Sequence, residues 1–94
     1  MKNIKINDKD WKYVPTEYDC DLFTTYDIGV SSALLCSGFE LLNVDKENPQ
    51  KALFVFRLED DIEQTANQYF SDTLEVRARS FMDHLKALKN LLYN

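Results

Sequence analysis

The sequence predicts an α+β fold, a small antiparallel sheet with three helices in the order β-α-β-β-α-α, preceded by an N-terminal arm. Three observations predict this class. Two short runs of β-branched and aromatic residues flank a turn at Asn48-Pro49 and indicate a hairpin. A short apolar segment between Asp27 and Gly38 has the flanking residues of a helix. Residues 74–94 repeat apolar side chains at helical spacing.

The chain is expected to hold one domain, residues 19–94, after an arm of residues 1–18. A chain of 94 residues buries about two-thirds of its unfolded surface, which suffices for a single core. In the arm, Ile4 and Ile6 alternate with polar residues, which is compatible with a short edge strand. We expect three aromatic side chains of the arm to lie against the domain: Trp11, Tyr13 and Tyr18.

The first half of the domain is expected to form a strand and then a helix. Residues 22–26 are β-prone, because they combine phenylalanine, tyrosine and two threonines. Asp27 is a plausible N-cap for a helix over residues 28–37. Gly38 would then occupy the C′ position, where a left-handed backbone conformation favours glycine.

The middle of the domain is expected to form a hairpin, with strands over residues 39–44 and 51–58 joined by a turn over 45–50. Apolar residues point alternately to both sides of the second of these strands. Burial on both faces is typical of a central strand. We therefore predict that residues 51–58 lie in the middle of the sheet.

Two helices are expected to follow the hairpin. One starts with the acidic run 59–63 and ends near Phe70, before a break at residues 71–73. Its expected inward residues are Ile62, Ala66, Tyr69 and Phe70. The tail helix is predicted over residues 74–94 and has two distinct faces. Its apolar stripe consists of Phe81, Leu85, Leu88 and Leu92.

Charge is unevenly distributed along the chain, which has a formal net charge of −5. Both ends are mildly basic, whereas residues 14–73 contain twelve acidic and three basic residues. Overall acidity opposes non-specific binding to nucleic acid, because phosphate contacts supply most of that affinity. The first residues contain no apolar signal segment, and no apolar run is long enough to span a bilayer. We expect a cytoplasmic protein with no membrane partner.

Several short segments of the sequence form a pattern that consists mostly of expected core residues. Its members are Leu22-Phe23-Thr24, the segment from Leu34 to Phe39, Phe54-Val55-Phe56, Tyr69-Phe70 and a tail with Val76, Arg79, Phe81, Leu85-Lys86, Leu88-Lys89 and Leu92-Tyr93. In this pattern the chain resembles a family of small uncharacterised prokaryotic proteins, classed as a domain of unknown function, that occurs in bacteria, phages and mobile elements. The resemblance covers residues 19–93. It implies a phage or mobile-element setting and brings no catalytic residues with it.

Candidate catalytic and metal sites are weak in this sequence, and we expect no enzyme activity, no cofactor and no metal. The acidic run 59–63 is more simply explained as negative charge at a helix N-terminus. Asp83 and His84 are adjacent on a helix and do not face each other. A Cys36–His84 pair remains conceivable only if the fold brings the two together. Cys20 and Cys36 are expected to be reduced, because disulfides are unusual in the cytoplasm.

One basic surface remains as a candidate for binding. It consists of Arg79, Lys86, Lys89 and Tyr93 on the tail helix, extended by Lys9, Trp11 and Lys12 of the arm. The ordinary alternative is a solvated helix face. The first functional hypothesis is a non-enzymatic interaction protein that binds a host or phage protein, for example as an anti-defence inhibitor. In this hypothesis the acidic surface would steer the protein toward a basic partner. The alternative is a nucleic-acid-binding accessory protein, and a homo-oligomer is also left open.

Overall fold

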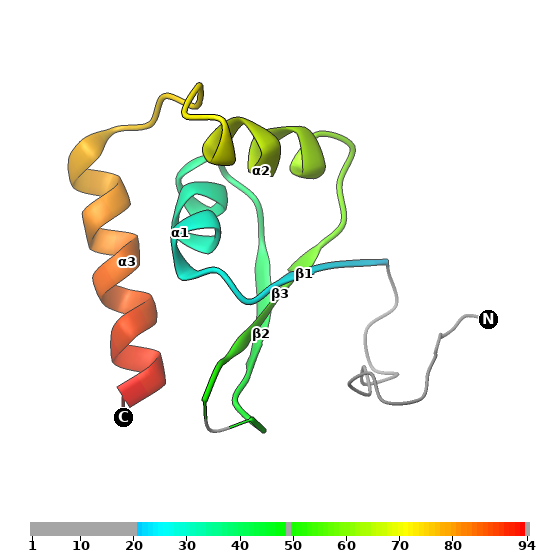
Figure 1. Ribbon diagram of the computed structural model, residues 1–94, viewed down its shortest axis with the longest axis vertical. Coiled ribbons are helices and arrows are strands. Elements are labelled where there is room, and N and C mark those ends of the chain that lie inside the picture. Colours follow the sequence, from blue (N-terminus) through cyan, green and yellow to red (C-terminus); the bar gives the residue numbers. More distant parts are fainter. Residues whose placement is uncertain (1–20, 49, 94) are drawn as a thin grey trace.

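The computed structural model, which describes residues 21–48 and 50–93, contains a three-stranded antiparallel sheet and three helices (Figure 1). The elements are β1 (Leu22–Thr25), α1 (Ile28–Cys36), β2 (Leu41–Asp45), β3 (Leu53–Arg57), α2 (Ile62–Phe70) and α3 (Ala78–Tyr93). The predicted fold class and element order are confirmed. The arm lies outside the described residues, so the expectations for Ile4, Ile6, Trp11, Tyr13 and Tyr18 stay predictions.

The sheet has the order β1-β3-β2, so the predicted hairpin and the central position of its second strand are confirmed. Phe56 on β3 pairs with Phe23 on β1 and with Leu41 on β2. The register of β2 then shifts by one residue, because Asn43 lies opposite Val55. This irregularity leaves one extra residue on β2 and lies on an edge strand, where bulges interrupt pairing with further strands.

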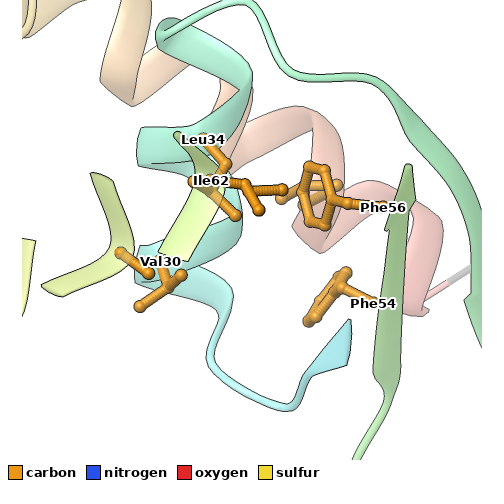
Figure 2. Packing of buried hydrophobic residues seen from close by; sticks show 7 residues of the cluster. Val30, Leu34, Phe54, Phe56 and Ile62 are labelled. Atoms are coloured by element: carbon orange, nitrogen blue, oxygen red, sulfur yellow. The ribbon is translucent and has the colours of Figure 1, made fainter. Parts of the chain in front are cut away.

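The hydrophobic core lies where the three helices meet one face of β3. Figure 2 shows Val30 and Leu34 of α1 opposite Phe54 and Phe56 of β3, with Ile62 of α2 beside them. All five side chains are at least 98% buried. α1 is the central helix, because it packs on α3, on α2 and against β1. Burying aliphatic and aromatic side chains of this size contributes about 1.5–3 kcal/mol each.

α1 is buried on most of its circumference, from Gly29 to Leu34. Two serines in this stretch, Ser31 and Ser32, are fully buried. Their hydroxyls donate hydrogen bonds to the carbonyls of Asp27 and Ile28, at 3.0 and 2.8 Å. A buried hydroxyl without such a partner would destabilise the fold, so these bonds permit polar residues in the core.

β3 is buried on both faces, as its sequence predicts. Val55 points to the face opposite Phe54 and Phe56 and is only 5% exposed. Val55 does not belong to the cluster in which the helices meet the sheet. The three described helices therefore share one face of β3 as their common core.

The ends of α1 agree with the predicted caps. The Asp27 side chain accepts a hydrogen bond from the Val30 amide at 2.9 Å. Gly38 has a φ of 93°, and its amide donates to the Leu35 carbonyl. The Phe39 amide donates to the Leu34 carbonyl, which completes a Schellman motif. Because Phe39 belongs to this helix end, β2 begins at residue 41 and not at residue 39.

Three further elements differ in their bounds from the prediction. α2 begins at Ile62, because residues 59–61 form a turn in which the Ile62 amide donates to the Glu59 carbonyl. β3 covers residues 53–57 and not 51–58. α3 begins at Ala78 and not at residue 74. The predicted inward position of Phe70 is also wrong, because this side chain is 64% exposed at the last position of α2.

Candidate functional site: the outward face of the C-terminal helix

α3 packs on α1 through the apolar stripe that the sequence predicts. Leu88 is fully buried, whereas Phe81, Leu85 and Leu92 are half-buried. Leu92 also contacts the main core cluster. Figure 1 shows α3 running along the outside of α1, with its other side free of the described elements. One side of α3 is therefore structural, and the rest of its circumference, including the side next to the apolar stripe, is open to solvent.

Five exposed side chains line the open side of α3, and we call them the outward strip: Arg79, Met82, Lys86, Lys89 and Tyr93. They are alternately three and four residues apart, so at about 100° per residue they fall within a sector about 80° wide. The strip extends over fifteen residues, from Arg79 to Tyr93, which is about 21 Å along the helix. Tyr93 is 80% exposed and Met82 is 46% exposed. The strip is thus cationic and carries two large apolar side chains.

Four of the seven residues that the sequence singles out lie in this strip. Met82 is not among the seven candidates, although its spacing from Arg79 and Lys86 places it on the same side of the helix. The three candidates in the arm, Lys9, Trp11 and Lys12, lie outside the described residues.

A contact from the hairpin holds the C-terminal end of α3. The Nζ atom of Lys46 donates a hydrogen bond to the carbonyl oxygen of Leu91 at 2.8 Å. A cation at this position satisfies a free carbonyl of the last turn and stabilises the helix dipole. At the other end, the Phe81 amide donates to the Arg77 carbonyl at 2.9 Å. The outward strip is therefore displayed on a helix that is held by its buried stripe and at its C-terminal end.

An open pocket of about 440 Å³ lies between the end of α1 and the start of α3. It is lined by Cys36, Ser37, Glu75, Val76, Arg77 and Ser80. Burial raises the pKa of the Cys36 thiol, which lowers the fraction of reactive thiolate. Cys36 is a free thiol. His84 is half-buried, and no hydrogen bond among the described residues joins it to Cys36.

The acidic side chains around the start of α2 are all exposed: Glu59, Asp60, Asp61 and Glu63. Asp61 occupies the N-cap position but its side chain makes no capping hydrogen bond. Within residues 21–48 and 50–93, no group of three or more histidine, cysteine, aspartate or glutamate side chains is arranged to hold a metal ion. Across the same residues, none of the helices has the length and apolar character needed to cross a bilayer.

Comparison with known protein families gives a match over most of the chain. The model of a family described as a domain of unknown function, DUF5659, matches residues 20–94. No curated protein and no solved structure matches the chain. The matched range begins just before β1 and includes every described strand and helix. The chain therefore belongs to the DUF5659 family, and its family domain carries the whole described fold together with the outward strip.

Proposed function

We propose that this protein is a non-enzymatic interaction protein that binds another protein through the outward strip of α3. The observation that carries the proposal is the strip itself. Five exposed side chains follow one line on a packed helix, and two of them, Met82 and Tyr93, expose large apolar groups. Aromatic residues, methionine and arginine are enriched in protein interfaces relative to the rest of a protein surface. A flexible methionine also adapts to different partner surfaces.

The chemistry of the pocket beside α3 supports binding over catalysis. The raised pKa of Cys36 disfavours the thiolate, which is the nucleophilic form of cysteine. The hydroxyl of Ser37 already donates a hydrogen bond to the Ala33 carbonyl at 2.9 Å. A catalytic serine or cysteine requires activation by a base within hydrogen-bond reach. Neither side chain is activated in this way among the described residues.

A nucleic-acid-binding role is the second candidate, because the exposed Tyr93 ring lies on the same side as three cations and could stack on a base. The charge count favours a protein. Three phosphate contacts give a salt slope of only about −2.7 for a duplex, which corresponds to a weak electrostatic contribution. The arm residues Lys9, Trp11 and Lys12 would have to supply additional contacts.

The setting that we propose is that of a phage or mobile element, with the protein acting in the cytoplasm on a host or phage protein. An inhibitor of a host defence system is one concrete form of this role. The support for this setting is the resemblance described above. A small scaffold with one displayed helix face is well suited to blocking a surface of a larger protein.

The test is affinity capture with the purified full chain as bait, from a prokaryotic host lysate divided into nuclease-treated and untreated halves. The bait is used as wild type, as the Lys86→Glu/Lys89→Glu variant and as a control. The control, Lys51→Glu/Arg77→Glu, changes the net charge equally but outside the strip. We expect a protein that the wild type and the control retain and the strip variant loses. Identical recovery by all three baits would contradict the proposal, and loss on nuclease treatment would favour the nucleic-acid role.

A further inference from the structure

We infer that the partner presents an acidic amphipathic helix, which lies along the outward strip of α3. This inference rests on the proposed function, because it specifies the partner's chemistry at the same surface. Two independent properties of the strip lead to it. One is the spacing of its five residues, and the other is their charge.

The spacing of the strip is the spacing of a helix-pairing seam. Residues 79, 82, 86, 89 and 93 repeat every 3.5 residues on average. A repeat of 3.5 keeps one line of side chains facing a second helix when the two cross at about +20°. The strip continues for about four helical turns. A partner helix that follows the slight left-handed supercoil of such a repeat can therefore contact all five positions.

The charge of the strip selects the character of that helix. Three of the five positions, Arg79, Lys86 and Lys89, are cationic, and none of the five is acidic. Carboxylates on a partner helix would pair with these cations, and apolar side chains would cover Met82 and Tyr93. The aliphatic stems of the cations would add apolar contact area.

The edge of the strip restricts the position of the partner further. Asp83 is exposed and lies about 40° beyond Arg79 around the helix axis. An acidic helix displaced toward Asp83 would meet a like charge, so the partner helix is expected to lie on the Met82 side. Repulsion between like charges also disfavours a second copy of this protein as the partner at the strip. Two copies facing each other would oppose three cations to three cations, and such contacts cost several kcal/mol.

The experiment measures binding of the full chain to synthetic peptides long enough to lie along the whole strip. The first probe is an acidic heptad peptide of glutamate and leucine. The second has the same composition with prolines that prevent a helix, and the third carries lysine in place of glutamate. A single-stranded oligonucleotide is the fourth probe. Titrations by fluorescence anisotropy at two salt concentrations use the wild type, Lys86→Glu/Lys89→Glu and the control Lys51→Glu/Arg77→Glu.

We expect salt-sensitive binding of the acidic helical peptide only, weakened about tenfold or more by Lys86→Glu/Lys89→Glu and unchanged in the control. Circular dichroism of each variant verifies that the fold is retained. Equal binding of the proline-containing peptide would overturn the helix assignment. The inference would also be overturned if the oligonucleotide bound more tightly than the acidic peptide. The same holds if Lys86→Glu/Lys89→Glu bound the acidic peptide as tightly as the wild type, or if the protein sedimented as a dimer with the strip covered. If no peptide binds while affinity capture still shows a strip-dependent protein, this inference fails and the proposed function stands.

Discussion

Replacing Asp72 with glycine should stabilise the protein, because this residue ends α2 in a conformation that suits glycine better. Asp72 has a φ of 62°, in the left-handed region. Its amide donates to the Tyr69 carbonyl at 3.1 Å, and the Thr73 amide donates to the Gln68 carbonyl at 2.9 Å. These two bonds form the same Schellman motif that Gly38 completes at the end of α1. The residue with the positive φ is glycine at the end of α1 and aspartate at the end of α2.

The size of the effect follows from two contributions at Asp72. A left-handed residue with a Cβ atom costs about 1–2 kcal/mol, and aspartate is at the lower end of that range. Glycine loses about 0.5–1 kcal/mol through the greater freedom of the unfolded chain, so the net backbone gain is at most about 0.5 kcal/mol. An acidic charge near a helix C-terminus is unfavourable by about 0.3–1 kcal/mol. Removing both costs predicts a gain of about 1 kcal/mol, or about 4–8 °C in Tm for a domain of this size.

The assay is thermal and urea unfolding followed by circular dichroism, with two control variants. Asp72→Asn removes the charge but keeps the Cβ atom, so it should give about half of the gain and lose that gain at high salt. Gly38→Ala should destabilise by about 1 kcal/mol through backbone strain alone. A methyl group there would meet no other atom within 4 Å. An unchanged or lower Tm for Asp72→Gly would refute the reasoning about the left-handed helix end.

Three further predictions concern the packing and the thiol. Gly29→Ala should destabilise by about 1–3 kcal/mol, because the new Cβ atom would overlap the Tyr69 hydroxyl and lie 2.9 Å from its Cζ. In a Tyr69→Ala background the same substitution should lower the free energy of unfolding by less. An equal loss of stability in both backgrounds would exclude this clash. Leu88→Ala should lower the free energy of unfolding by about 2–5 kcal/mol in urea unfolding, because Leu88 is the residue of α3 that is buried in the core cluster. In a Cys20→Ser background, alkylation of Cys36 should be slower in the folded than in the unfolded protein at the same pH, because burial raises its pKa. Because the pKa of Cys36 is higher in the folded than in the unfolded protein, the thiol's contribution to stability is fully present below the pKa of the unfolded state. The contribution is lost as the pH rises through the pKa of the folded state.

The parts of the fold that were predictable from sequence are those with a strong local signal. Asp27 and Gly38 mark the two ends of α1, and both caps are present. The start of α2 was misplaced because an acidic run also suits the first turn of a helix. The structure shows a turn there that ends with the Ile62 amide on the Glu59 carbonyl. Favourable charge near a helix N-terminus is compatible with both conformations and therefore could not distinguish them.

Long-range packing explains the other differences. Phe70 was assigned to the inward side of α2 together with Ile62, Ala66 and Tyr69. The structure turns Tyr69 toward Gly29 of α1 and leaves Phe70 exposed, with the two rings packed edge to face. A hydrophobic pattern alone does not show where along a helix the contact with the rest of the domain stops. Of the outward strip, the sequence indicated the charged residues and Tyr93, whereas Met82 required attention to the 3.5-residue repeat.

The two sides of α3 separate stability from binding, and this separation makes the proposed function testable in so small a protein. Leu88 holds α3 on the core, so its loss should affect every property that depends on the fold. Lys86 and Lys89 are exposed, and substitutions of such residues usually change stability by no more than about 0.5 kcal/mol. A strip variant that loses its partner and keeps its Tm therefore reports on the surface itself. A variant that loses its partner and also has a lower Tm shows only that the fold is damaged. A binding role for α3 is supported only by loss of the partner at an unchanged Tm.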